Sequence, residues 1–526
     1  MMKLPNGWAM EPLAKLGTWT GGGTPSTTNA EFWNNGTIPW VSPKDMKQRR
    51  ITTAQDLITE AAVKSSATNL IAENSVMLVT RSGILRHSLP VATNTKPVTL
   101  NQDMKALSPL EGVNSDYLYF AFRRFERDIL HGCCKGGTTV QSIEASRLMA
   151  FEMPIAPTAE QRRIVAKIEE LFSELDKGRE NLRQARAQLA VYRQALLKQA
   201  FEGQLTAAWR ETHAAQLESA DQLLARLRAE REARYQQQLT DWRVSFSRWE
   251  KSGGNTGKPS KPSKPEPQAP ISPELHKPLS QLPANWTYLR LGEVIDEPAY
   301  GTSKKCGYET AGIGVLRIPN VVAGAIDATD LKFAAFSPEE IQSYTLQLGD
   351  LLMIRSNGSV SIVGRCARVR EAHTHLLYAG YLIRLRAHAT AVESAFLLHQ
   401  VISHALRLQI EKAAKSTSGV NNINSGEIRS LVIALCSVAE QREIVTQLEQ
   451  KLAVIESLEA DIDANLQRAE ALRQAILKKA FAGELVPQDS ADEPADALLA
   501  RLRTEREGEA KVCKTQSKPA VRRQKS

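Results

Sequence analysis

The sequence predicts an α+β protein in which two mixed α/β domains are joined by a long antiparallel two-helix coiled coil, with pseudo-two-fold symmetry. Three observations support this prediction. The segment 159–205 (AEQRRIV…YRQALLKQAFEGQL) returns without a gap at 439–485 (AEQREIV…LRQAILKKAFAGEL). Apolar residues in both copies follow a heptad rhythm, and the stretch before each copy is rich in β-branched residues, Gly and Pro. A repeat of this length indicates a duplicated half-molecule.

Each copy of the repeat predicts one long helix, the first over 159–200. Apolar or small residues recur in alternating steps of four and three, the spacing of a coiled coil. Lys451 and Asn465 interrupt this seam in the second helix, and polar seam residues fix the register of a pairing. We expect the two helices to pack on each other in antiparallel orientation; the alternative is two unrelated amphipathic helices, each packed on its own domain. The predicted coiled-coil interface comprises Ile164, Ile168, Leu171, Leu175, Leu182, Leu189, Ile444, Leu448, Ile455, Leu458, Ile462, Leu472 and Ile476.

Changes in composition divide the chain into six segments. These are a first α/β domain (1–157), a first helical region (158–250) with the long helix 159–200 and a docking helix 219–250, a Lys/Pro-rich linker (251–281), a second α/β domain (282–437), a second helical region (438–507) and a basic tail (508–526). The linker is expected to be extended and partly polyproline-like. The tail is low in apolar residues, so we expect it to be disordered.

The two α/β domains share sequence features only near their ends. Leu4-Pro5-x-x-Trp8 returns as Leu282-Pro283-x-x-Trp286, and the segment 136–148 (GGTTVQSIEASRL) aligns with 416–428 (STSGVNNINSGEI). Between these flanks the sequences diverge. A repeated frame with different contents is typical of a scaffold that presents two different recognition surfaces.

The composition limits the class of protein and its compartment. The formal charge is +9 and the pI is near 9.1, which is compatible with a polyanionic partner such as nucleic acid. The sequence contains no run of eighteen apolar residues, so no membrane span is predicted. The N-terminal stretch lacks the apolar core of a secretory signal. Six cysteines without a CxxC pair argue against a disulfide framework and a zinc site. We therefore expect a cytoplasmic protein without a membrane partner.

The motifs of enzymes are incomplete in this chain. GGNTGKP resembles a phosphate-binding loop, but Pro259 follows Lys258 where Ser or Thr is required. Gly312-Ile313-Gly314 lacks the third glycine of a dinucleotide fingerprint. The histidines show no metal-binding spacing, with His373 and His375 the nearest approach, so no metal site is predicted. We expect a chain without catalytic residues of its own.

Polar, glycine-rich loops with basic residues occur in matching places before the two helices, and they are the candidate sites for DNA binding. Glycine lets a backbone approach closely, Ser, Thr and amide N–H groups bind phosphate oxygens, and Lys and Arg neutralise them. The alternative is ordinary turns with solvated charges. The candidate residues are Thr24, Ser26, Lys44, Arg81, Lys135, Thr138, Thr302, Ser303, Lys304, Arg317, Arg355, Asn357 and Lys415.

Taken together, these segments resemble the specificity subunit of Type I restriction–modification systems. The resemblance covers nearly the whole chain apart from the linker and the basic tail. The opening EQxxIV and the close AFxG(E/Q)L, both duplicated, form its most specific part. The segments that carry it are IPWVSPKDM (38–46), VTRSG (79–83), PIAPTAEQRRIV (154–165), RQALLKQAFEGQL (193–205), SVAEQREIV (437–445) and the stretch 473–507.

The resemblance implies a non-catalytic subunit with two target-recognition domains, each reading one half of a bipartite, asymmetric site in double-stranded DNA. The paired helices would act as a ruler for the spacer between the halves. The implied partners are modification subunits, two in number, which methylate adenine, and restriction subunits driven by ATP. S-adenosylmethionine, ATP and Mg²⁺ would belong to those partners, with no cofactor in this chain.

Two features depart from the family pattern, and two other functions remain alternatives. The junction ALCSVAEQ before the second helix lacks the proline pair of the first (Pro154 and Pro157), and the segment 206–281 is long. One alternative is a coiled-coil protein-interaction scaffold without DNA specificity, which would show no salt-sensitive DNA binding. The other is a stand-alone methyltransferase or nuclease, which would be active as an isolated chain.

Overall fold

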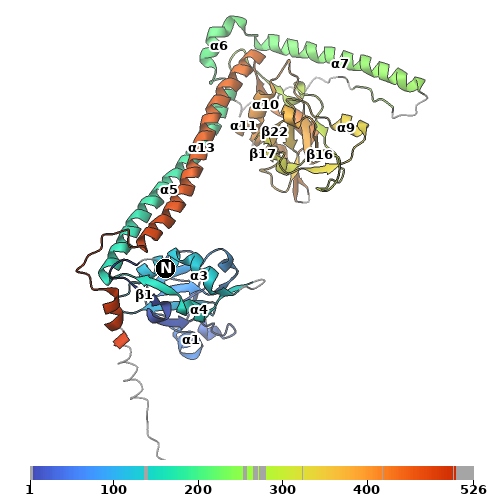
Figure 1. Ribbon diagram of the computed structural model, residues 1–526. Coiled ribbons are helices and arrows are strands. Elements are labelled where there is room, and N and C mark those ends of the chain that lie inside the picture. Colours follow the sequence, from blue (N-terminus) through green and yellow to red (C-terminus); the bar gives the residue numbers. More distant parts are fainter. Residues whose placement is uncertain are drawn as a thin grey trace, which may run out of the picture. The chain divides into compact units, whose positions relative to one another are not determined.

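The computed structural model describes residues 4–135, 140–252, 258–262, 264, 271, 280–322, 324–417, 419–501 and 503–504. It divides into two compact units (Figure 1). Unit 1 consists of Met1–Arg183 and Ile462–Ser526, and unit 2 of Gln184–Asp461. Both long helices contribute one part to each unit. Among the described helices, none is long and apolar enough to cross a membrane.

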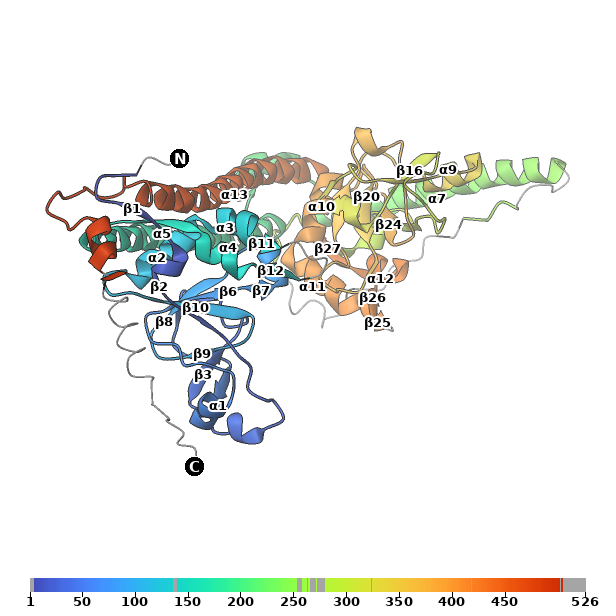
Figure 2. The same ribbon diagram turned by 60° about the horizontal axis from the view of Figure 1, so that its bottom comes forward.

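The described part of the first α/β domain, residues 4–135 and 140–157 of unit 1, contains four sheets. Its central strand β6 (Val76–Val79) is completely buried, as expected for an apolar strand covered on both faces. The sheet orders are β1 (Ala9–Pro12)–β13 (Glu152–Ile155); β2 (Gly17–Gly21)–β10 (Met104–Pro109)–β6–β8 (Val91–Asn94)–β4 (Arg50–Ile51); β5 (Asp56–Ile58)–β3 (Ile38–Val41)–β9 (Thr99–Leu100); and β11 (Cys134–Lys135)–β12 (Gln141–Ile143)–β7 (Arg81–Ser82). The helices are α1 (Glu60–Ser65), α2 (Ser115–Arg124), α3 (Glu126–Cys133) and α4 (Ala145–Ala150), and α2 packs on β6 and β8 (Figure 2).

The second α/β domain, residues 282–437 of unit 2, has the same kinds of sheets. Its buried central strand is β20 (Leu351–Ile354). The sheet orders are β14 (Thr287–Arg290)–β27 (Val432–Leu435); β15 (Ala299–Tyr300)–β24 (Leu382–Leu385)–β20–β22 (Cys366–Arg368); β19 (Lys332–Ala334)–β16 (Ile313–Leu316)–β23 (Leu377–Tyr378); β25 (Lys415–Thr417)–β26 (Val420–Asn422)–β21 (Ser356–Asn357); and β17 (Val321–Val322)–β18 (Ala325–Ile326). The helices are α9 (Pro338–Tyr344), α10 (Ser394–Ile402), α11 (His404–Ala413) and α12 (Ser425–Ser430).

The two domains share one topology. The strands of each sheet appear in the same chain order, and the pairs β3–β9 and β16–β23 are both parallel whereas their neighbours are antiparallel. The second domain adds the β17–β18 hairpin, and β4 has no counterpart among its described strands. The sequence predicted kinship only at the domain ends, but the common topology runs through the diverged interior as well.

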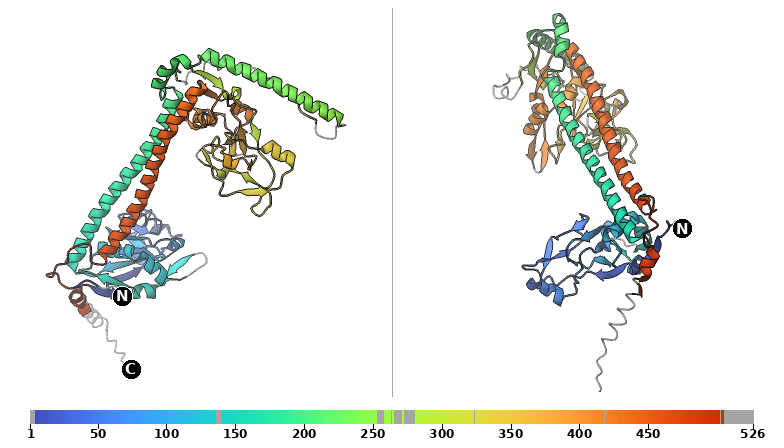
Figure 3. Two further views of the ribbon diagram at one scale, coloured as in Figure 1. Left: turned by 45° about the horizontal axis from the view of Figure 1, so that its top comes forward. Right: turned by 90° about the vertical axis from the view of Figure 1, so that its left-hand side faces the viewer.

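Two long helices, α5 (Thr158–Phe201) and α13 (Val438–Ala480), follow the α/β domains. The predicted helix 159–200 thus falls within α5. At 44 residues, α5 has a length of about 66 Å at about 1.5 Å per residue. In unit 1, Asp176 lies 2.7 Å from Arg473 and Arg179 lies 3.8 Å from Glu470, so numbering rises on one helix as it falls on the other. The helices are therefore antiparallel there (Figure 3).

The seam of α13 differs in phase from the prediction. Leu458 and Leu472, predicted to lie in the interface, are 45% and 47% exposed, while Leu452 is buried. Lys451 and Asn465, predicted to interrupt the seam, lie outside it. The seam runs instead through positions 448, 452, 455, 459, 462, 466, 469, 473 and 476, each of which is buried or half-buried.

The physical reason for this shift is that charged residues occupy seam positions. Arg193 of α5 is half-buried and donates to Glu459 of α13 at 3.0 Å, both within unit 2. Arg473 is half-buried in unit 1, where its guanidinium lies 4.5 Å from the ring centre of Phe172. Arginine stems can bury their methylene groups while the charged end pairs with an acid. A pattern of apolar residues alone therefore selects Leu458 and Leu472, whereas the seam passes through the adjacent charged residues Glu459 and Arg473.

The other predicted seam residues are at least partly buried. Ile164, Ile168, Ile444 and Leu448 are fully buried where each helix leaves its α/β domain. Those nearer the helix middles or ends are buried or half-buried: Leu171, Leu175, Leu182, Leu189, Ile455, Ile462 and Ile476.

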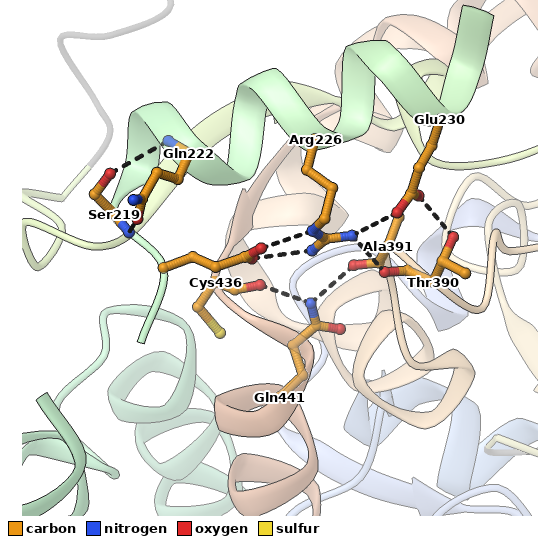
Figure 4. A network of polar contacts seen from close by, with 9 residues as sticks. Ser219, Gln222, Arg226, Glu230, Thr390, Ala391, Cys436 and Gln441 are labelled. Atoms are coloured by element: carbon orange, nitrogen blue, oxygen red, sulfur yellow. Dashed lines mark hydrogen bonds and ion pairs between the residues drawn. The ribbon is translucent and has the colours of Figure 1, made fainter. Parts of the chain in front are cut away.

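Helix α7 (Ala220–Lys251) follows α6 (Ala207–His213) in unit 2 and begins with a capping box. Ser219 Oγ accepts from the backbone N–H of Gln222, and Gln222 Oε1 accepts from that of Ser219 (Figure 4). Leu223 and Leu227 are buried in the core of unit 2. The docking helix predicted over 219–250 lies at this position. In unit 1, residues 495–501 are helical, at the place of the second copy of its sequence. The basic tail 508–526 and most of the linker 251–281 lie outside the described residues.

Candidate nucleic-acid interface

A buried glutamate at the start of each long helix ties that helix to its α/β domain. In unit 1, Glu160 accepts a hydrogen bond from the indole Nε1 of Trp8 at 3.0 Å, and in unit 2, Glu440 accepts one from Trp286 at 3.0 Å. Both glutamates are buried. The repeated Leu-Pro-x-x-Trp and Ala-Glu-Gln elements are therefore the two sides of one contact, which each unit makes once.

The glutamine after each glutamate holds the loop that precedes α2 or α10. Gln161 accepts from the backbone N–H of Asn114 at 2.8 Å and donates to the carbonyl of Ala156 at 2.8 Å. Gln441 accepts from the backbone N–H of Glu393 and donates to the carbonyl of Cys436, both at 2.8 Å. Both ends of each amide are bonded to backbone, so each α/β domain is fixed to the start of its long helix.

The two glutamates differ in how completely they are bonded. Glu440 accepts from three further side chains: Thr206 Oγ1 at 2.9 Å, Arg210 Nε at 2.8 Å and Asn285 Nδ2 at 3.0 Å. Glu160 Oε1 has no hydrogen-bond partner among the described residues. Burial raises the pKa of Glu160, against the lowering effect of the Trp8 hydrogen bond.

In unit 2, two of the predicted loops, those of Thr302 and Arg355, meet at the turn 378–382 and form with it what we call the Tyr300 cluster, made of Tyr300, Arg355 and Tyr381. The guanidinium of Arg355 lies 4.7 Å from the ring centre of Tyr300, and its Nη1 donates to the carbonyl of Gly380 at 3.2 Å. Its backbone N–H donates to the carbonyl of Tyr381 at 3.0 Å. Tyr300 and Tyr381 are 42% and 62% exposed.

A glycine is required next to this cluster because two backbones approach closely. A Cβ at Gly301 would lie against the carbonyl groups of Tyr378 and Ala379, nearer than van der Waals contact allows. The following residue, Thr302, donates its backbone N–H to the carbonyl of Tyr378 at 2.9 Å and accepts from Gly380 at 2.7 Å. The loop 300–302 is thereby fixed to the turn that also holds Arg355.

In unit 1 the corresponding loops meet in the same way. Arg81 donates its backbone N–H to the carbonyl of Asp103 at 3.2 Å, as Arg355 does to Tyr381. The hydroxyl of Thr24 bonds to Gln102 in the same turn, and Gly23 donates to Leu100 at 2.9 Å. The Arg81 side chain is exposed, and no carboxylate in the described part of the chain forms an ion pair with it.

A three-stranded sheet extends each of these groups. In unit 1, Arg81 on β7 lies opposite Ser142 on β12, which lies opposite Lys135 on β11. In unit 2, Asn357 lies opposite Asn421, while Ser356 and Lys415 flank Asn422 on β26. The predicted residues Arg81 and Lys135 are therefore brought into one sheet, and Asn357 and Lys415 into another.

Other predicted residues lie elsewhere or are already engaged. Thr302 is only 5% exposed and its hydroxyl accepts from the backbone of Lys304, so it shapes the turn rather than facing outward. Lys304 pairs with Glu340 at 2.8 Å, and Arg317 pairs with Asp330 at 3.0 Å. Their charges are thus partly neutralised by neighbouring acids, which the sequence spacing did not reveal.

Of the remaining candidate DNA-binding residues, some are described with their side chains and others are not. Ser26 lies near the β5–β3–β9 sheet, where its carbonyl accepts from Trp33 Nε1 at 3.0 Å; Lys44 and Ser303 are exposed. Lys135 lies 3.7 Å from Glu144. Thr138 lies outside the described residues, and Lys415 is placed on β25 by its backbone alone.

Sequence reasoning missed Tyr300, Tyr381 and the pair Asn421-Asn422. An exposed tyrosine face can stack on bases, and an Asn amide can donate to and accept from an adenine edge. The doubled asparagine in GVNNINS was a usable signal, because two adjacent amides on a short strand are polar on both faces. Tyr381 had no such signal, since its exposure depends on the turn 378–382.

Within the described residues, no group of three or more His, Cys, Asp or Glu side chains could hold a metal ion. The arrangement of the loops suits binding instead. Backbone amides and cations can contact phosphates, and aromatic and amide groups can contact bases.

Comparisons with known proteins agree with this architecture of two α/β domains and two long helices. Residues 5–183 match the family model described as "Type I restriction modification DNA specificity domain". The specificity subunit of the EcoKI Type I restriction enzyme of Escherichia coli (strain K12) is 26% identical over 518 residues, which cover 96% of each chain. Residues 5–183 thus carry a DNA specificity domain of the Type I restriction–modification kind, and nearly the whole chain is similar to a Type I specificity subunit. This assignment agrees with the resemblance noted from the repeated motifs.

A second member of the specificity subunit family is more similar over a shorter stretch. The EcoR124I/EcoR124II specificity subunit of Escherichia coli is 46% identical over 153 residues, 29% of this chain and 38% of that protein. A solved chain from a study of complex assembly and conformational transition in the Type I R-M system has a TM-score of 0.61, with 18% identity, over 92% of this chain and 99% of that chain. At that identity it shows a common fold.

Proposed function

We propose that this chain is a specificity subunit, which recognises DNA for a Type I restriction–modification complex, with each α/β domain contacting one half of a bipartite, asymmetric site. One observation carries the proposal. Two domains with the same topology place corresponding loops together but equip them differently, with Arg81 and Thr24 in one and Arg355, Tyr300 and Tyr381 in the other. A common frame with different surface groups suits two different half-sequences.

In each domain the contacts would divide into two kinds. Lysines, arginines and backbone N–H groups position the domain on the phosphates, and a few polar side chains on the short β7 and β21 sheets read base edges. Arg355 is held at both its backbone and its guanidinium, so its orientation is set before DNA arrives. Such pre-organisation lowers the entropic cost of binding.

The continuous helices α5 and α13 would set the spacing between the half-sites. A helix of about 66 Å corresponds to about two turns of duplex, at about 34 Å per turn. Insertion of one heptad in both helices is expected to lengthen the spacer and leave each half-sequence unchanged. An unchanged spacer in such a variant would contradict this part of the proposal.

We further propose that the chain supplies no catalytic group and works in the cytoplasm with two modification subunits and with restriction subunits. The methyl donor S-adenosylmethionine, ATP and Mg²⁺ are assigned to those partners. The similarity of the chain to Type I specificity subunits supports this division of labour, in which specificity and chemistry lie on separate polypeptides.

Co-expression with its modification subunits and mapping of N6-methyladenine in the host DNA test the proposal. The expected result is a single bipartite motif that disappears when this chain is omitted. Binding of labelled duplex should also weaken steeply with salt. A chain that assembles with the modification subunits but yields neither a motif nor salt-sensitive DNA binding would be a protein-interaction scaffold instead.

A further inference from the structure

One face of helix α7 can be divided along its length into a first, a middle and a distal part. Only the first part, with Leu223 and Leu227, packs into the core of unit 2. Near the far end of the helix, Trp242, Phe246 and Trp249 recur at helical spacing, with neighbouring ring centres 5.2 and 5.5 Å apart. Trp242 Nε1 donates to the carbonyl of Pro259 at 3.0 Å. The described part of the linker therefore covers this aromatic part of α7.

The linker runs back along α7 in the opposite direction. Lys258 Nζ lies 5.4 Å from the ring centre of Phe246, and Lys261 Nζ lies 5.9 Å from that of Trp242, so rising linker numbers match falling helix numbers. We call α7 with linker residues 258–262 and 264 the arm. Its distal part, residues 242–252, 258–262 and 264, carries six basic residues and one acidic residue, Glu250: Arg243, Arg248, Lys251, Lys258, Lys261 and Lys264.

The middle part of this face of α7 lines a cavity of about 720 Å³ against the second α/β domain. The arm contributes Arg231, Arg234 and Lys264, and the domain contributes Asp296, His388 and Arg429 among others. All of these residues belong to unit 2.

The two acids of the cavity are already paired within the second α/β domain. Asp296 lies 3.0 Å from His388 Nε2, and Glu297 lies 2.8 Å from Arg429. Arg234 and Lys264 form no ion pair with a carboxylate in the described ranges, although Arg234 lies near enough to Asp296 and Glu230 to help lower the pKa of each. Burial lowers the pKa of Arg231; the nearby Glu293 opposes this lowering and Arg429 adds to it.

We propose that this cavity and the distal arm form a third DNA-contacting surface, which binds phosphates of the duplex backbone through Arg234 and Lys264. This inference rests on the proposed function and adds a contact outside the two recognition surfaces. It contributes affinity and not sequence choice, because phosphates are the same at every base pair.

Duplex DNA is favoured over a small anion because the positive charge continues along the arm beyond the cavity. It is also favoured by position. Arg429 lies on α12, whose first residue, Ser425, donates its backbone N–H to the hydroxyl of Tyr300 at 3.1 Å. One short helix thus joins the wall of the cavity to the Tyr300 cluster.

The test compares two double variants of the full chain in complex with its modification subunits. Arg234→Ala with Lys264→Ala removes both charges, and Arg234→Lys with Lys264→Arg keeps them. Binding of a labelled duplex carrying the mapped site is measured by anisotropy over a series of salt concentrations. The alanine variant should lower the slope of log affinity against log salt by about two and the affinity at 0.1 M salt by about tenfold. The charge-preserving variant should behave as the unaltered chain, and the methylated motif should be the same in all three.

The outcomes separate this inference from the proposed function. If the unaltered chain directs no specific methylation, the proposed function itself fails. If it does, but the alanine variant keeps the original salt slope, only the third surface is refuted. Loss of the modification subunits from the purified alanine variant would assign the arm to an acidic protein partner and would equally overturn the DNA contact.

Discussion

Arg210 and Glu440 form an ion pair with an N–O distance of 2.7 Å inside unit 2, where the Glu440 side chain has no exposed surface and that of Arg210 is 17% exposed. The pair joins the segment after α5 to the first turn of α13. Its counterpart in unit 1, Glu160, has Trp8 as its hydrogen-bond donor and one oxygen without a described partner. The same position in the repeat therefore has two different energetic roles.

Replacing Glu440 by Gln should destabilise the start of α13 much more than Glu160→Gln destabilises the start of α5. The first change leaves Arg210 as a buried charge without its counter-ion, which costs about 3 kcal/mol, whereas the second removes a carboxylate that is poorly bonded. Native-state hydrogen exchange at the two helix starts measures each effect locally, since a chain of several domains does not unfold in one step. Equal losses of protection in both variants would contradict the assignment.

The stability of unit 1 should decrease as the pH rises from the ordinary Glu value of 4.5 through the raised pKa of Glu160. Burial raises this pKa in the folded state, so the folded state holds the proton more tightly than the unfolded state in that interval. The contribution is therefore complete below 4.5 and is lost above the raised pKa. Hydrogen exchange near Trp8 at a series of pH values measures it, and Glu160→Gln should make that profile flatter. A steeper profile in Glu160→Gln would contradict this origin.

Ile455→Ala should destabilise the paired helices by about 3 kcal/mol, whereas Leu458→Ala should cost less than about 0.5 kcal/mol. Ile455 is 2% exposed and Leu458 is 45% exposed, although both were predicted to lie in the interface. Hydrogen exchange along α13 provides the measurement. The two variants serve as each other's control because they lie one turn apart on the same helix, and a larger effect of Leu458→Ala would restore the predicted seam.

Arg355→Ala should weaken binding of the complex to duplex DNA by about tenfold or more and relax discrimination at one half-site. Lys304→Ala should weaken it by about threefold or less, since Glu340 already partly neutralises that charge. Competition between duplexes altered in one half-site at a time measures both effects. If Arg355→Ala impaired both half-sites equally, Arg355 would be a general phosphate contact and not part of a half-site reader.

The sequence predicted the long helices well because their signals are local and repeated. The limits 159–200 agree with those of α5 to within one residue at each end. The phase of α13 could not be predicted from apolar residues, because Glu459 and Arg473 lie in the seam through pairing with residues far away in the chain. The candidate loops followed from glycine and basic residues, yet the exposure of Tyr381 and the burial of Thr302 depend on a turn that only the folded sheet creates.

In each α/β domain the chain enters on one strand and leaves on its antiparallel neighbour, β1 beside β13 and β14 beside β27. In topological terms, the chain between these paired end strands is a single insertion, attached to the rest of the unit at that strand pair. Exchange of the whole insertion for another of the same topology would leave the paired end strands, the tryptophan–glutamate contact and the long helices unchanged. New target sequences can therefore arise by replacement of the domain interior, without any change in the end strands or in the long helices.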